Sequence, residues 1–169
     1  MVWSLDSADK YVLPKATAAG VQACLWLGKS AMWCLRASER GLMRVLIVED
    51  ERAVTELLRR WLKEWNYDVN VAPSATDALK TMLAEPAEII LCDIRMPGHH
   101  DGLWLAERVR AKWPRTKIIM ASGVVEMDAV KKSQELGVLD YITKPFDREL
   151  LRKALDRAAG AVGYDTIAE

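Results

Sequence analysis

Five side chains that could together handle a phosphoryl group stand where short apolar runs of the sequence end. They are three carboxylates, a hydroxyl and an ammonium, namely Glu49, Asp50, Asp93, Ser122 and Lys144. Three acids brought together repel one another and need a cation to neutralise them. Carboxylate oxygens suit a hard ion, and proteins hold Mg²⁺ with few carboxylates and several waters. An ammonium and a hydroxyl beside such an ion would contact phosphoryl oxygens, so the set predicts magnesium-dependent phosphoryl chemistry.

Each of these residues also has an ordinary structural explanation when it is taken alone. Asp50 could cap the first helix, Ser122 could cap a turn, and Lys144 could be a solvated charge at the end of a strand. The functional interpretation therefore depends on whether the fold brings all five together.

The sequence from residue 43 onward predicts a regular alternation of strands and helices. The apolar runs that predict strands lie at 44–48, 67–72, 88–92, 117–121 and 140–143. Patterns with apolar residues near i, i+3, i+4 and i+7 follow them, at 51–65, 74–85, 101–113, 128–137 and 147–159. Ser74 and Asp147 stand at N-cap positions, and Gly137 stands where a helix would end.

Five βα units in strict alternation predict an α/β fold, a doubly wound, five-stranded parallel sheet of (βα)5 type. The second run is the most polar, so we place it at an edge, in the flavodoxin-like order 2-1-3-4-5. In an open parallel sheet, ligands bind at the carboxyl ends of the strands near the point where the strand order reverses. The five side chains would then meet at one edge of the sheet.

Composition excludes several other classes of protein. The chain has 169 residues, of which 24 are Lys or Arg and 24 are Asp or Glu, so no basic excess points to nucleic acid. Its three cysteines, Cys24, Cys34 and Cys92, lack zinc-type spacing, and their odd number argues against a disulfide framework. A reducing cytoplasm is therefore the expected location. No apolar run reaches the length of a membrane span.

Residues 1–42 do not join the alternating pattern. The segment from Thr17 to Ala37 could form one helix with an apolar stripe, or it could be the apolar core of a targeting or membrane-associated segment. Alternatively, the natural chain could begin at Met43, with the earlier residues an artefact of start-site choice or an extension without fixed structure. We therefore expect three parts: an N-terminal extension at 1–42, a main domain at 43–160 and a tail at 161–169.

Four motifs in the main domain resemble those of the response-regulator receiver domain of two-component signalling, of which chemotaxis receivers are examples. They are "LIVED", "CDIRMPGHHDG", "IIMASG" and "DYITKPF", and the resemblance covers about 43–160. It implies that Asp93 is the phosphoacceptor and that Mg²⁺ is held by Glu49, Asp50, Asp93 and the backbone carbonyl of Arg95. It further implies that Ser122 and Lys144 contact the phosphoryl group, that Tyr141 is a switch residue together with Ser122, and that Pro145 follows a cis peptide bond.

The resemblance implies a signalling phosphoacceptor, not an enzyme, that promotes its own phosphorylation and dephosphorylation. The donor would be a phosphohistidine of a sensor histidine kinase or a histidine phosphotransfer protein. The aspartyl phosphate would change protein–protein contacts through the fourth helix, fifth strand and fifth helix of the repeat. The downstream target would be a protein, not nucleic acid or a membrane. The resemblance also allows a dimer that forms on phosphorylation. Arg95 lies two residues after Asp93, and Val124 lies two residues after Ser122. The side chains at these two positions suggest that the aspartyl phosphate would hydrolyse slowly by itself.

Other interpretations remain beside this one. The tail is too short for an output domain, so the chain is either a stand-alone receiver or a piece of a larger regulator or hybrid kinase. A pseudo-receiver that serves only as an interaction module would have lost some of the site residues, and all are present. Aspartyl-phosphate hydrolases need a second Asp where this chain has Arg95. The loop after Asp93 is one residue longer than is usual for the family, and we interpret His99 and His100 as loop residues, not metal ligands.

Overall fold

The computed structural model describes residues 42–124 and 127–165. The elements follow one another in strict alternation: β1 (Arg44–Val48), α2 (Arg52–Glu64), β2 (Asp68–Ala72), α3 (Ala75–Ala84), β3 (Ile89–Asp93), α4 (Gly102–Lys112), β4 (Lys117–Ser122), α5 (Met127–Glu135), β5 (Asp140–Thr143) and α6 (Arg148–Asp165). The expectations for the N-terminal extension fall on residues 1–41, which lie outside the described residues.

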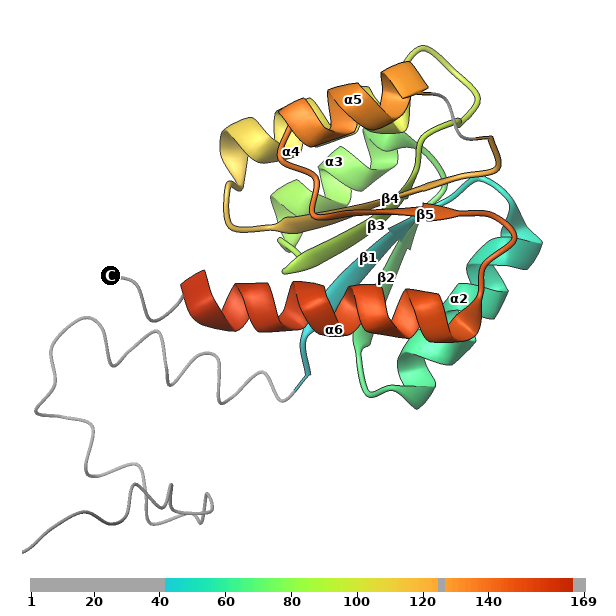
Figure 1. Ribbon diagram of the computed structural model, residues 1–169, viewed down its shortest axis with the longest axis vertical. Coiled ribbons are helices and arrows are strands. Elements are labelled where there is room, and N and C mark those ends of the chain that lie inside the picture. Colours follow the sequence, from blue (N-terminus) through green and yellow to red (C-terminus); the bar gives the residue numbers. More distant parts are fainter. Residues whose placement is uncertain (1–41, 125–126, 166–169) are drawn as a thin grey trace, which may run out of the picture. The chain divides into compact units, whose positions relative to one another are not determined.

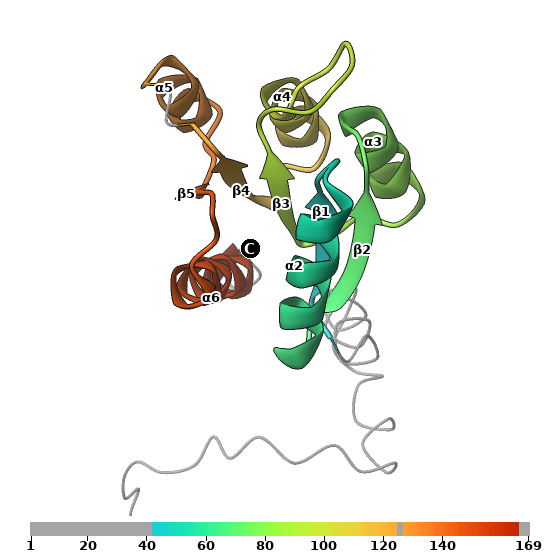
Figure 2. The same ribbon diagram turned by 90° about the vertical axis from the view of Figure 1, so that its right-hand side faces the viewer.

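The five strands form one parallel sheet in the order β2-β1-β3-β4-β5, which confirms the predicted fold class and strand order. Figures 1 and 2 show the helices α3, α4 and α5 on one face of the sheet and the helices α2 and α6 on the other. The most polar strand, β2, lies at an edge as predicted, and its residues are more exposed than those of β1 and β3.

Both faces of the sheet are covered by apolar side chains, because successive strand residues point to opposite faces. In β1, Leu46 and Val48 join the core beneath α3, α4 and α5. Val45 and Ile47 join the core beneath α2 and α6. The central strands β1 and β3 are therefore apolar except at their ends, where Arg44 begins β1 and Asp93 ends β3 at the carboxyl edge.

The helix ends use the predicted capping residues. The Ser74 side chain accepts a hydrogen bond from the Asp77 N–H, and Asp147 Oδ1 accepts from the N–H groups of Glu149 and Leu150. Gly137 has a φ of 69° just after α5, the left-handed conformation that glycine adopts without strain. Asp50 does not cap the first helix: the cap residue of α2 is Glu51, and its side chain makes no capping bond.

Helix α6 runs to Asp165, past residue 160, where we expected the domain to end and a tail to begin. Ala159 and Val162 still pack against the core beneath α2 and α6. This packing offsets the low helix propensity of Gly160. Within the described part of the chain, none of the helices combines the length and the apolar character that a membrane span requires.

Candidate functional site

The strand register brings the predicted side chains to one edge of the sheet. The last residue of β1 pairs with the residue before Asp93, so Glu49 and Asp93 lie side by side. Asp93 pairs with the residue before Ser122, and Ser122 pairs with the residue before Lys144. Asp93 and Ser122 are themselves the last residues of β3 and β4, one position later than the predicted strand ends.

Three carboxylates of this edge form a compact cluster. One carboxylate oxygen from each of Glu49, Asp50 and Asp93 lies within 4.8 Å of the other two. Glu49 and Asp93 are buried, with 3% and 7% of their surface exposed, whereas Asp50 is exposed. The cluster is therefore closed on the protein side and open to solvent at Asp50.

Lys144 directly follows β5, and its side chain contacts this cluster. Its Nζ lies 2.6 Å from Glu49 Oε2 and 2.6 Å from Asp93 Oδ2, so one ammonium pairs with both buried acids. The Lys144 N–H donates to the Ser122 carbonyl at 2.8 Å, which holds this residue beside β4. The Lys144–Pro145 peptide bond is cis, the form that the family resemblance implies.

The pKa of Glu49 and that of Lys144 are both raised, for different reasons. Burial raises the pKa of the Glu49 carboxyl and outweighs the opposite effect of the hydrogen bond and charge of Lys144. Burial alone would lower the pKa of Lys144. The hydrogen bonds and negative charges of Asp93 and Glu49 more than offset that effect and raise the pKa. The surroundings thus favour the charged form of Lys144, whereas burial disfavours the ionised form of Glu49.

The backbone of the loop after β3 orients the Asp93 carboxylate. The Arg95 N–H donates to Asp93 Oδ1 at 3.0 Å, while Lys144 donates to Oδ2. The Ile94 N–H donates to the carbonyl of Ala121 at 2.9 Å, which continues the sheet one residue past the strand. Each carboxylate oxygen of Asp93 therefore has one fixed donor and keeps lone pairs available.

Ser122 and Tyr141 share one backbone acceptor, the carbonyl of Val124. Ser122 Oγ donates to it at 2.7 Å and accepts from the Val124 N–H at 3.2 Å. Tyr141 Oη also lies 3.4 Å from the Val124 carbonyl oxygen. Ser122 itself is buried, and Tyr141 is half-buried. The two predicted switch residues are thus connected through the backbone of the β4–α5 loop.

The donor set fits a hard divalent cation. With all three acids ionised, three negative charges and the one positive charge of Lys144 leave a net charge of −2. The cluster offers only oxygen ligands, which suit Mg²⁺ and not zinc or copper. Among the described residues, no other group of His, Cys, Asp and Glu side chains has a geometry that could hold a metal.

The two histidines of the lengthened loop take no part in that cluster. His99 is exposed, as expected for a loop residue. His100 is half-buried and its ring stacks on Trp104 of α4, with ring centroids 3.7 Å apart and planes 10° apart. The Arg108 guanidinium carbon lies 3.7 Å from the same Trp104 centroid. Two groups this close to the centre of one ring would collide on the same face, so Trp104 lies between His100 and Arg108.

Sequence reasoning missed two contributors to this site. The Val124 carbonyl is a backbone group that every residue type carries, so its role as an acceptor cannot be predicted from the residue type. Gly102, the first residue of α4, packs against the peptide group of Asp93. Its signal was visible in the quoted motif "CDIRMPGHHDG", where a glycine directly follows the N-cap aspartate, but a contact between helix and strand cannot be read from that spacing.

Comparisons with known proteins agree with the fold and the motifs. A sequence model described as the response regulator receiver domain matches residues 45–156. The chain is 29% identical over 119 residues to the transcriptional regulatory protein ZraR of Salmonella typhimurium, a match that covers 70% of this chain and 27% of that protein. It is 33% identical over 115 residues to the NtrX-like protein of Rickettsia felis, with 68% and 24% covered. The chain thus spans about a quarter of the length of these curated relatives.

Solved structures of receiver proteins have the same fold as this chain. A CheY-like response regulator receiver domain protein from Methanospirillum hungatei superposes with a TM-score of 0.67 at 29% identity, covering 71% of this chain and 96% of that one. A response regulator receiver protein from Pseudomonas putida superposes with a TM-score of 0.65 at 27% identity, covering 69% and 97%.

Proposed function

This chain belongs to the response regulator receiver domain family, and on that premise we propose that Asp93 accepts a phosphoryl group from a phosphohistidine of a sensor histidine kinase or a histidine phosphotransfer protein. The observation that carries the proposal is the position of the Asp93 carboxylate, 2.6 Å from Lys144 Nζ and within 4.8 Å of the acids Glu49 and Asp50.

In the proposed reaction, a carboxylate oxygen of Asp93 attacks the phosphorus atom. The P–N bond to the donor imidazole breaks, and the imidazole nitrogen keeps the electron pair. The Arg95 N–H and Lys144 hold the Asp93 carboxylate in one orientation, so the entropy of orienting the nucleophile is already lost on folding. Lys144 then pairs with a phosphoryl oxygen, because its ammonium already lies beside the reacting carboxylate.

The metal ligands would be Glu49, Asp50, Asp93 and the backbone carbonyl of Arg95. Bound there, Mg²⁺ would neutralise charge that develops on the phosphoryl oxygens during the transfer. The raised pKa of the Glu49 carboxyl supports this assignment, because a buried acid that is costly to ionise gains most from a neighbouring divalent cation.

We assign Ser122 and Tyr141 to the switch that follows phosphorylation. Ser122 Oγ would donate to the phosphoryl group, and Tyr141 would change its position on the face formed by α5, β5 and α6. A downstream protein would contact this face, and a dimer formed on phosphorylation would be one further use of it. The shared Val124 carbonyl supports the assignment, since it gives the two side chains a common hydrogen-bond partner.

The test is phosphorylation with a small donor in the absence of any kinase. With Mg²⁺ and acetyl phosphate, intact-protein mass spectrometry should show one added phosphoryl group. Asp93→Asn should abolish it, whereas Asp128→Asn, which changes an exposed aspartate on α5, should not. Equal labelling of the Asp93→Asn protein would refute the acceptor assignment, and a wild-type chain that takes no label would support the pseudo-receiver alternative.

Lys144→Ala extends the test to the proposed switch. This variant should still accept phosphate, more slowly, but should respond poorly to phosphorylation in a partner-binding assay. A full partner response in the variant would count against the role of the lysine.

A further inference from the structure

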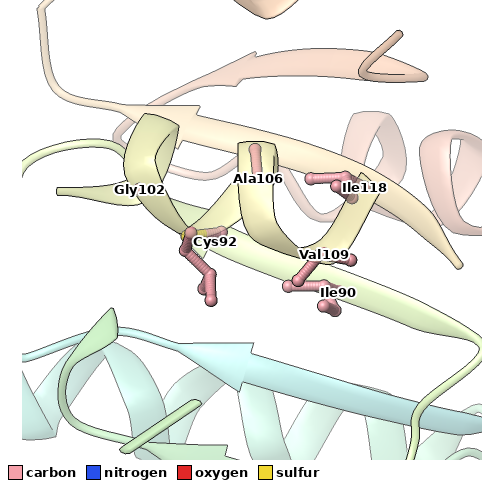
Figure 3. A pocket seen from close by; sticks show the side chains of 7 residues that line it. Ile90, Cys92, Gly102, Ala106, Val109 and Ile118 are labelled. Atoms are coloured by element: carbon pink, nitrogen blue, oxygen red, sulfur yellow. The ribbon is translucent and has the colours of Figure 1, made fainter. Parts of the chain in front are cut away.

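Helix α4 begins in direct contact with the strand that carries the phosphoacceptor. Figure 3 shows Gly102 at the start of the helix and Ala106 one turn later, both against β3 where Ile90 and Cys92 lie. The Gly102 N–H donates to the Ile94 carbonyl at 2.9 Å, and Asp101 caps the helix by accepting from the Trp104 N–H at 2.8 Å. The start of α4 is therefore fixed by hydrogen bonds as well as by packing.

No side chain fits at position 102. A Cβ added to Gly102 would lie 2.2 Å from the Asp93 carbonyl oxygen, 3.0 Å from the Asp93 carbonyl carbon and 3.0 Å from Cys92 Sγ. Even close C–H···O contacts in proteins keep carbon and oxygen roughly 3.3 Å apart, so the overlap is about 1 Å. The nearest atoms belong to the backbone of Asp93, which cannot rotate away as the end of a flexible side chain could.

Helix α4 cannot easily move away to relieve this overlap. Leu105, Ala106 and Val109 each have at most 1% of their surface exposed, and they pack into the core on this face of the sheet. A close-packed interior transmits such strain to its neighbours. Some of the displacement would therefore fall on the Asp93 peptide group, whose carbonyl also accepts a hydrogen bond from Cys92 Sγ at 3.1 Å.

We propose that Gly102 is a positioning residue for the phosphoacceptor, an inference that rests on the proposed function of Asp93. The absence of a side chain lets α4 lie directly against the Asp93 peptide group and so fixes the main chain from which the reactive carboxylate projects. The carboxylate must meet Lys144 Nζ at 2.6 Å and the Arg95 N–H at 3.0 Å at the same time. A displacement of about 1 Å breaks such an arrangement and can cost roughly 100-fold in rate.

The test compares two glycine-to-alanine variants of the full chain. Gly102→Ala should be phosphorylated by acetyl phosphate about 100-fold more slowly than the wild type. Gly160→Ala is the matched control, because a Cβ at this exposed position of α6 meets no atom within 4 Å, and it should react at the wild-type rate. Rates are expressed per folded molecule, with the folded fraction measured by circular dichroism. If Gly102→Ala is partly unfolded, trimethylamine N-oxide is added to all samples to restore the folded state.

A second measurement needs neither metal nor phosphodonor. The amide proton of Arg95 reports directly on the Asp93 carboxylate that it contacts. In a nuclear magnetic resonance spectrum of the metal-free protein, Gly102→Ala should shift the Arg95 amide resonance and leave the amides of α6 in place. A role in folding alone would lower stability without changing the rate per folded molecule.

Three outcomes are decisive. A wild-type rate per folded molecule in Gly102→Ala would overturn the inference, and so would an unchanged Arg95 resonance. A wild-type chain that takes no label would instead refute the proposed function, whatever the Arg95 resonance shows.

Discussion

Replacement of Lys144 by methionine should destabilise the protein markedly and in a pH-dependent way. Methionine keeps much of the apolar stem and removes the charge, so the change isolates the electrostatic role. The side chains of Glu49 and Asp93 are 2% and 8% exposed, and that of Lys144 is 18% exposed. The variant would leave two buried carboxylates side by side without their cation.

The expected loss follows from this burial. Removal of one partner from a buried ion pair typically costs 3–5 kcal/mol, because the remaining charge is left without compensation. Two features of the site place Lys144→Met at the lower end, about 3 kcal/mol near neutral pH. The cluster opens to solvent on the side of Asp50, and Glu49 can take up a proton when the cation is absent.

The loss should grow as the pH rises. The pKa of folded Glu49 lies above its ordinary value of 4.5, chiefly because of burial, so its contribution to stability is fully present below that value and disappears as the pH rises through the folded pKa. Without Lys144, two of the three effects that lower this pKa are gone, and only the backbone hydrogen bond from Glu51 remains, so the destabilisation at neutral pH is larger. In the wild type, the contribution of Lys144 is present below its ordinary pKa of 10.5 and is lost only as the pH rises through its raised folded pKa.

Urea unfolding followed by circular dichroism, with a chelator present, measures this directly at about pH 5 and about pH 7.5. Lys80→Met is the matched control, because Lys80 pairs with Asp77 on the exposed surface of α3 and its loss should change stability little. Addition of Mg²⁺ at 100 times its dissociation constant should stabilise the variant by about 2.7 kcal/mol. Equal stability of Lys144→Met and wild type near neutral pH, or a deficit that does not shrink toward pH 5, would refute the reasoning.

Two further predictions concern contacts outside the site. Arg110 donates hydrogen bonds to the carbonyls of Leu136 and Gly137 at 3.1 and 2.6 Å, joining α4 to the end of α5. Arg110→Met should therefore lower the free energy of unfolding by about 3 kcal/mol, and an unchanged urea midpoint would contradict this. The stack of His100 on Trp104 should appear in a double-mutant cycle of His100→Ala and Trp104→Leu as a coupling of about 1 kcal/mol. Strictly additive effects would show that the stack contributes nothing.

Most of the fold could be predicted because it depends on patterns that repeat along the chain. The low exposure of β1 and β3 follows from their uninterrupted apolar runs, and the polar run at 67–72 correctly predicted an edge strand. The end of α6 could not be predicted in this way. The expected helical pattern ended at residue 159, whereas Val162 extends the packed face, and the balance between propensity and burial depends on what the helix contacts.

Part of the candidate site could likewise be predicted from the sequence, and part of it could not. Strand order and parallel register alone bring Asp93 beside Glu49, so their proximity followed from the sequence. The length of the loop after Asp93 was visible, but its conformation was not. Gly98 adopts a φ of 112° in this loop, and His100 turns back onto Trp104. Both depend on how the loop lies over α4, which no pattern in the loop itself encodes.

The single hydroxyl hydrogen of Ser122 limits what the proposed switch can do. A serine hydroxyl donates only one hydrogen bond, and in this structure Ser122 donates it to the Val124 carbonyl at 2.7 Å. A bond from Ser122 to a phosphoryl group on Asp93 would therefore break the bond to Val124. The carbonyl would then be left for Tyr141 Oη, which already lies 3.4 Å away. Because a polar group that loses its partner is costly unless another replaces it, phosphorylation would favour a shorter bond between Tyr141 and Val124. The proposed switch thus needs no rearrangement of the sheet, only an exchange of donors at one carbonyl group.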